Sequence, residues 1–261
     1  AMSFADGRGF AVGDAGTALR TDDGGATWTG LVTGTTAGLT RVQAVTPDVV
    51  TILGGSGCAF RRSTDGGKTF TRVYVVTEQN CPNPVEAAFF VSPEVGYLLL
   101  EDGSVLRTAD GGDTFSKKTA IPGTPSSTGG GGATPSDAWF TTPDTGVVET
   151  TGGTFRTTDA GVSWKPITSP GGTRFLFVDS NVAYLYGSQG VTRSADGGVT
   201  WAPAIPVAGG VAATGFAPAN CHAYQHQAVL AVMQECVKRA RGGDGVLHRL
   251  LRIQADQGYA D

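Results

Sequence analysis

Short runs of apolar and β-branched residues alternate along the chain with clusters of Gly, Asp, Ser and Thr. The first four runs cover residues 3–6, 9–13, 17–20 and 27–31. Short apolar runs bounded by turn residues predict β-strands joined by tight turns. The same plan of four runs begins again at residues 39, 85, 138 and 174. The pattern therefore predicts an all-β chain built from repeated four-stranded units.

A nine-residue motif joins the third and fourth strand of each predicted unit. Its form is Arg, Ser or Thr, any residue, Asp, Gly or Ala, Gly, any residue, Thr or Ser, and an aromatic residue. The five copies cover residues 20–28, 62–70, 107–115, 156–164 and 193–201. Asp accepts hydrogen bonds from backbone amides that follow it, and Gly adopts positive φ at low cost. The motif therefore predicts a hairpin turn with internal hydrogen bonds, covered by the aromatic side chain.

The motif recurs at a spacing that indicates the architecture. Its aspartates, Asp23, Asp65, Asp110, Asp159 and Asp196, follow one another at intervals of 37–49 residues. A period near forty in a β-rich chain is typical of propeller blades. In 261 residues this period leaves room for about six blades, and a sixth innermost strand is expected at 211–216. We predict a β-propeller of about six four-stranded blades over residues 1–224.

The C-terminal segment 225–261 does not follow this plan, because it contains no copy of the motif. Residues 228–240 favour a helix by propensity. The segment is either a divergent sixth blade or a partly helical tail. An open ring would expose the backbone of an edge strand. We therefore expect the tail to close or cap the ring by packing on the first or the fifth blade, or a second chain to do so in a homodimer.

The nine-residue motif resembles the Asp-box, or BNR (bacterial neuraminidase), repeat with its pattern Ser/Thr-x-Asp-x-Gly-x-Thr-Trp. Two copies have Phe in place of Trp, and one has Ser in place of Thr. Segment 9–21 resembles the blades of the photosystem II stability/assembly factor family, and this likeness extends to about residue 218. The resemblance implies a propeller that binds or assembles a partner. It also implies that the boxes lie at the outer rim, away from the functional face.

The five box aspartates are the most regular carboxylates in the chain, which raises the question of catalysis or metal binding. A catalytic carboxylate is needed once or twice and not in every repeat. We therefore predict that the box aspartates are structural. The more distant resemblance to sialidases does not extend to their activity, because the chain has no Arg-Ile-Pro motif and no Tyr with an assignable Glu partner.

Composition limits the cellular compartments and the classes of partner that fit this chain. The formal net charge is −4, which argues against a nucleic-acid-binding protein. No apolar run is long enough to span a membrane as a helix. The high content of Gly, Ser and Thr, with few lysines, fits a secreted or periplasmic protein. Because the sequence opens on Ala1-Met2, we expect a secretory signal to be missing from it.

Four cysteines allow two disulfides. Cys58 opens a third strand and Cys81 lies in a connector between blades, so both are expected on one face of the propeller. We predict a Cys58–Cys81 disulfide. Cys221 and Cys236 either form a second bond or stay free. Together with His222 and His226 they match no standard zinc spacing, so we expect no metal site and no cofactor.

The segment 122–135 is rich in Gly, Ser, Thr and Pro, which predicts a long flexible connector between the third and the fourth blade. No Lys-Ser/Thr pair follows its glycines, so it is not a phosphate-binding loop. The connector is expected on the same face as Cys81. It is either a solvated insertion or a flap over that face.

Candidate ligand-binding residues lie near the starts of the innermost strands, at one mouth of the central channel. Counting back from Pro47, Pro93 and Pro143 places Arg41 and Asp137 at equivalent positions, with Glu86 one position away, and Arg174 is the candidate in the fifth unit. Arg41 and Arg174 could hold an anionic or glycan ligand. Glu86 and Asp137 could form a carboxylate pair for glycoside chemistry. Alternatively, the four side chains form salt bridges at a solvated rim.

Two classes of function follow from the sequence. The first is a binding or assembly propeller that takes a protein partner or a small ligand at the channel mouth. The alternative is a hydrolase of glycosides or other ester-like bonds at the same place. The chain has no Gly-x-Ser-x-Gly, His-Glu-x-x-His, Walker or Cys-x-x-Cys motif, which favours the binding module and leaves enzyme activity open.

Overall fold

The computed structural model describes residues 1–73, 81–124, 133–167, 174–177, 181–187 and 190–205. Within them the strands form five antiparallel sheets. The first sheet contains β1 (Met2–Ala5), β2 (Arg8–Val12), β3 (Ala18–Thr21) and β4 (Thr29–Leu31), with a short 3₁₀ helix η1 (Asp14–Gly16) before β3. The second contains β5 (Leu39–Ala44), β6 (Val50–Gly54), β7 (Ala59–Ser63) and β8 (Thr71–Arg72). The third contains β9 (Val85–Phe90), β10 (Gly96–Leu100), β11 (Val105–Thr108) and β12 (Ser116–Lys117). The fourth contains β13 (Pro135–Phe140), β14 (Gly146–Thr150), β15 (Gly153–Thr157) and β16 (Lys165–Ile167), and the fifth contains β17 (Arg174–Phe177), β18 (Ala183–Gly187) and β19 (Gly190–Ser194).

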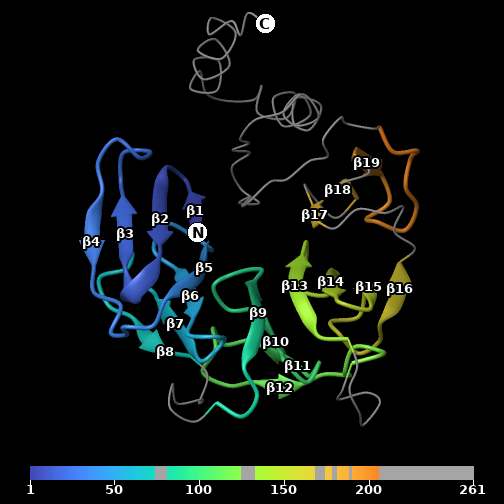
Figure 1. Ribbon diagram of the computed structural model, residues 1–261, viewed down its shortest axis with the longest axis horizontal. Coiled ribbons are helices and arrows are strands. Elements are labelled where there is room, and N and C mark those ends of the chain that lie inside the picture. The colour runs from blue at the N-terminus through green and yellow to red at the C-terminus, as the bar shows by residue number, and fades with distance from the viewer. Residues whose placement is uncertain (74–80, 125–132, 168–173, 178–180, 188–189, 206–261) are drawn as a thin grey trace, which may run out of the picture.

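Every sheet is an antiparallel meander in which each strand pairs with the next along the chain. Figure 1 shows the sheets following one another around a common centre, with β1, β5, β9, β13 and β17 nearest to it and β4, β8, β12 and β16 at the periphery. This is the arrangement of propeller blades. The all-β prediction and the repeated four-stranded unit are confirmed.

The fifth sheet differs from the expected plan. A strand was expected over 200–205, but in the described residues only Ile205 forms a bridge, to Val191. Pro203 lies in this segment and has no amide proton to donate to a ladder. The fourth innermost strand also begins earlier than expected, at Pro135 instead of residue 138. The expected sixth innermost strand, the tail 225–261 and much of the connector 122–135 lie outside the described residues.

The core lies between neighbouring sheets. Tyr97 in β10 is fully buried, and its ring stacks on Phe140 of β13 with centroids 3.7 Å apart and planes 3° apart. Phe89, Val105 and Ile121 belong to the same cluster. Leu53 and Phe60 of the second sheet pack in turn with Phe90 and Leu98 of the third. The second and third sheets therefore have a packed neighbour on each side, and this explains the wholly buried strands β6 and β10.

Side chains of one sheet also bind carbonyl groups of the next. Nη1 of Arg8 donates to the carbonyl of Pro47 at 2.9 Å, and Nη2 of Arg62 donates to that of Pro93 at 2.6 Å. The matching carbonyl of Pro143 accepts from the Tyr97 hydroxyl at 2.7 Å, which itself accepts from Nε of Arg107 at 3.1 Å. The equivalent prolines are thus acceptors at three successive sheet junctions.

Candidate binding site at the rim opposite the Asp boxes

The Asp boxes all lie at one rim of the sheets. The box turn of each sheet is bonded to the turn between its first two strands: Gly24 N to Gly7 O, Gly66 N to Asp48 O, Gly111 N to Glu94 O, Ala160 N to Asp144 O and Gly197 N to Asn181 O. We call this end the box rim. The mouth rim is the opposite end, which carries the turns between second and third strands and the starts of β5, β9 and β13.

Each box aspartate binds its own turn. In the first copy Oδ1 of Asp23 accepts from the Thr27 amide at 2.8 Å and from the Thr21 hydroxyl at 2.7 Å, and Oδ2 accepts from the Thr27 hydroxyl at 2.6 Å. The Thr21 hydroxyl in turn accepts from the Gly25 amide at 2.8 Å. The same bonds recur around the other four aspartates, Asp65, Asp110, Asp159 and Asp196.

These hydrogen bonds stabilise the charged form of each carboxyl group. The hydroxyl of Thr or Ser four residues later and the backbone amide of the same residue hold the pKa of the Asp65 and Asp110 carboxyls well below the usual range, and the same donors lower the pKa of Asp23. Equivalent bonds lower the pKa of Asp159 and Asp196 to about 2. Both oxygens of each carboxylate are occupied within the turn, which is the geometry of a structural role.

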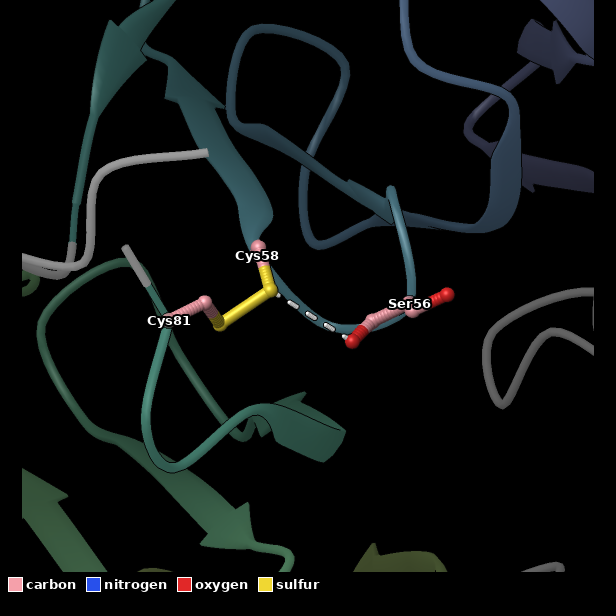
Figure 2. The surroundings of a disulfide bond; sticks show 3 residues. All are labelled: Ser56, Cys58 and Cys81. Carbon is pink, nitrogen blue, oxygen red and sulfur yellow. Dashed lines mark hydrogen bonds between the residues drawn. A yellow bond between two sulfur atoms is a disulfide. The ribbon is translucent and has the colours of Figure 1, made fainter. Parts of the chain in front are cut away.

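The mouth rim contains the Cys58–Cys81 disulfide. Figure 2 shows that it joins the turn between β6 and β7 to the segment that leads into β9. The expected bond is therefore present, and it links the second sheet to the third. A disulfide is compatible with an oxidising compartment.

Three innermost strands carry a β-bulge at the same position, close to the mouth rim. The bulges displace Thr40 in β5, Glu86 in β9 and Ser136 in β13 from regular pairing. A bulge places one extra residue in a strand and redirects its side chain. This explains why Glu86 lies one position from Arg41 and Asp137 in the alignment: it occupies the bulge itself.

The structure brings two predicted residues together. Nη1 of Arg41 lies 3.1 Å from Oδ1 of Asp137, and Nη2 of Arg41 donates to the Ser136 carbonyl at 2.6 Å. Arg41 belongs to the second sheet and Asp137 to the fourth, so the pair passes over β9, where the residue at the equivalent position is Ala87. The side chains are 42% and 50% exposed. An ion pair this exposed contributes less than about 1 kcal/mol, so a ligand can displace it at small cost.

Glu86 faces the same rim without a bonded partner. Within the part of the chain that the structure describes, its side chain makes no hydrogen bond and no ion pair. Partial burial raises the pKa of the Glu86 carboxyl, the nearby Glu101 carboxylate raises it further, and Arg41 opposes the shift. Glu101 lies in the turn after β10, and its amide donates to the carbonyl of Pro84 at 2.9 Å. Glu86 therefore lies near a second carboxylate, Glu101, which makes its ionised form less stable.

Arg174 begins β17, where it pairs in register with Tyr186. Its side chain lies outside what the structure describes, so its expected ligand role stays a prediction. Among the described residues no group of His, Cys, Asp and Glu is placed to hold a metal ion. Cys221, Cys236 and the three histidines fall outside the described ranges. Within these ranges no helix is long and apolar enough to cross a membrane.

Sequence reasoning missed Glu101, Thr40 and Ser136. The bulges that expose Thr40 and Ser136 have no local signal, because a bulge is defined by the register of the partner strand. Glu101 follows the apolar run 96–100, and the predicted turn would have placed it at the mouth rim. The sequence could thus have predicted that Glu86 and Glu101 lie at the same rim, but not that they are neighbours.

Comparison with known proteins supports the fold. No model of a protein family matches the sequence, and no curated protein sequence is significantly similar to it. A solved structure of YCF48 bound to D1 peptide is 17% identical with a TM-score of 0.55, covering 77% of this chain and 64% of that chain. YCF48 from Cyanidioschyzon merolae is also 17% identical with a TM-score of 0.55, covering 77% of this chain and 67% of that chain. The GH74 enzyme of Niastella koreensis is 19% identical with a TM-score of 0.58, covering 77% of this chain but 37% of that chain.

These similarities show a shared propeller fold. YCF48 is a photosystem II assembly factor with BNR repeats, so the resemblance inferred from the Asp boxes is confirmed. The chain matches about two thirds of the YCF48 structures and little more than a third of the GH74 enzyme. One fold thus serves a peptide-binding protein and an enzyme, and the choice between them depends on the site.

Proposed function

We propose that this protein is a binding module, active in the periplasm or outside the cell, whose mouth rim holds a segment of a partner protein. The segment carries a basic side chain that meets Glu86. YCF48 with its D1 peptide is a precedent for peptide binding by this fold. The role for this chain rests on its own residues.

The proposal rests on a difference between Arg41 and Glu86 at the mouth rim: the side chain of Arg41 has bonded partners and that of Glu86 has none among the residues that the structure describes. Arg41 already has two oxygen partners, one on Asp137 and one on Ser136. The side chain of Glu86 has neither a hydrogen bond nor an ion pair within the described residues, and Glu101 repels its charge. A partly buried carboxylate in this state gains from an incoming cation, since an opposite charge favours the ionised form. An anion would first have to displace Asp137 from Arg41.

Peptide binding can be tested with fluorescently labelled seven-residue peptides of Gly and Ser that carry a central Lys, Gln or Glu. We expect the Lys peptide to bind best by fluorescence anisotropy. Glu86→Gln should weaken its binding about tenfold, because one charge pair is lost while the shape is kept. Asp113→Asn is the matched control: Asp113 is an exposed acid of the same sheet, in the box turn. Equal binding of the three peptides, or equal weakening by both substitutions, would contradict the proposal.

The hydrolase remains a second candidate because of one feature, the raised pKa of Glu86. Burial raises the pKa of general acids in glycosidases in the same way. In this alternative Glu86 is the acid and Asp137 the second carboxylate. It requires turnover of chromogenic glycosides or esters that is abolished by Glu86→Gln and by Asp137→Asn. Turnover that survives both substitutions, or no turnover of any substrate, would speak against it.

A further inference from the structure

The turn between β6 and β7 has a costly backbone conformation. Gly55, Ser56 and Gly57 have φ values of +57°, +54° and +85°. Glycine adopts positive φ readily, whereas Ser56 has a Cβ and does not. Gly57 is also in tight contact with the next sheet: a Cβ there would lie 2.6–2.8 Å from atoms of Pro84 and Val85. The turn is thus a strained segment pressed against the start of β9.

The start of β9 is fixed at four points. The Asn83 side chain accepts from the Asp102 amide at 3.2 Å, and the Pro84 carbonyl accepts from the Glu101 amide at 2.9 Å. Both of these bonds stay within the third sheet. The other two lead to the second sheet: the Val85 amide donates to the Gly57 carbonyl at 3.1 Å, and Cys81 is bonded to Cys58. The links between the sheets therefore end on two adjacent residues of the strained turn.

The same junction separates two charged groups of the candidate site. Glu86 follows Val85 directly, whereas Arg41 belongs to β5 of the second sheet. Their electrostatic interaction crosses the junction that the disulfide closes. A shift of the start of β9 against the turn would change the spacing between Glu86 and Arg41.

The disulfide lies where it can be reduced to two thiols. Both cysteines are partly exposed, so the bond lies at the surface that a reductant approaches. Figure 2 shows Sγ of Cys58 beside the carbonyl oxygen of Ser56, at 3.6 Å. In the disulfide this sulfur carries no proton, and the approach is a contact only. After reduction the Cys58 thiol would have a proton to donate, with this acceptor already in place.

We propose that the Cys58–Cys81 bond is a redox switch, whose reduction by a dithiol frees the start of β9 and alters the Glu86–Arg41 site. A thiolate of the dithiol attacks one sulfur, forms a mixed disulfide and releases the other cysteine, which takes up a proton. The second thiol of the reductant then resolves the mixed disulfide. Two electrons pass to the protein, which ends with two thiols, and the reductant ends as a disulfide. The affinity consequence rests on the proposed function, whereas the change of geometry does not.

Hydrogen–deuterium exchange of the full chain, before and after treatment with dithiothreitol, tests the change of geometry. We expect amides in 55–58 and 81–86 to exchange about tenfold faster after reduction, while those of the third box, 107–115, are unchanged. The double substitution Cys58→Ser and Cys81→Ser should show the fast pattern without reductant and no change with it, which controls for Cys221 and Cys236. Unchanged exchange at 81–86 would overturn the switch, because reduction would then have no local effect. Equal acceleration in the box would also overturn it, because the bond would then stabilise the whole protein and not the start of β9 in particular.

Affinity for the labelled Lys peptide is the second measurement, and it separates the two proposals. We expect the reduced protein to bind about fivefold more weakly than the oxidised one. If both forms bind equally although exchange at 81–86 has changed, the bond does not control the site and the switch is overturned. If neither form binds, the proposed function fails, and the exchange data alone decide whether reduction frees the start of β9.

Discussion

The side chain of Gln43 in β5 binds both backbone groups of Phe90 in β9. Its Nε2 donates to the Phe90 carbonyl at 2.8 Å, and its Oε1 accepts from the Phe90 amide at 2.9 Å. The amide group thus pairs with a neighbouring blade as a strand would. At the corresponding position of β1, Ser3 accepts a single bond from the Ala44 amide, and in β9 Phe89 packs on Trp139 instead. The junctions change from polar to aromatic along the chain.

Replacing Gln43 should therefore destabilise the junction between the second and third sheets. Gln43→Met keeps the length of the side chain but leaves two backbone groups of Phe90 without their partner. We expect a loss of about 1–3 kcal/mol in the free energy of unfolding, measured in urea. Ser3→Ala removes one bond and should cost less. A smaller loss for Gln43→Met than for Ser3→Ala would contradict this ranking.

The box aspartates should affect stability and not binding. Asp65→Ala removes the acceptor of the Thr69 amide, the Thr69 hydroxyl and the Ser63 hydroxyl. We expect the melting temperature to fall by several degrees, about 3 °C or more. Asp113→Ala, an exposed acid of the third box, is the control and should change the melting temperature little. Loss of Lys-peptide binding by Asp65→Ala with unchanged melting would show that this residue is functional.

The same carboxylates predict acid sensitivity. Their pKa is lowered by folding, so the folded state binds fewer protons than the unfolded state as the pH falls below about 4. Their stabilisation is complete above that range and is lost as the pH approaches the folded pKa, which is about 2 for Asp159 and Asp196. We expect the melting temperature to be level above pH 5 and to fall steeply from pH 4 to pH 2. Asp159→Asn should flatten this fall, and an unchanged profile would refute the link.

The fourth box has an unfavourable residue at a turn position. Ala160 has φ +59°, where the other boxes have Gly24, Gly66, Gly111 and Gly197 with φ between +70° and +76°. Ala160→Gly should therefore stabilise the protein by about 0.5–1 kcal/mol. Gly24→Ala is the reverse test, because a Cβ there meets no atom within 4 Å and only the backbone is strained. Equal stability of Ala160→Gly and the unchanged protein would refute the argument.

The sequence predicted the features whose partners lie close along the chain. The bonds of Asp23 reach residues no more than four positions away, so a nine-residue motif is enough to predict them. Pairing of Cys58 with Cys81 was within reach because strand order alone puts both at one rim. The four-strand plan held in the first four sheets for the same reason, since every strand pairs with its neighbour in sequence.

The site was predicted less completely, because its contacts cross sheets. Arg41 and Asp137 were placed at equivalent positions, but nothing local indicated that they bond over β9. That contact includes the carbonyl of Ser136, the residue at the bulge of β13. Gln43 likewise has no motif around it. Its role depends on the distance between two sheets, which one sequence does not contain.

The proline carbonyls at the sheet junctions affect how such a chain can gain or lose repeats. At each junction the donor is a side chain of the preceding repeat, from Arg8, Arg62 or Tyr97, and the acceptor is backbone of the following repeat. A repeat duplicated within the chain would thus bring its own donor and find a ready acceptor, without any new side-chain match. Shortening exposes one half of a pair at either end. Removal of repeats from the N-terminus leaves a carbonyl without its donor, removal from the C-terminus leaves a guanidinium or a phenol without its acceptor, and water can take the missing place in both cases.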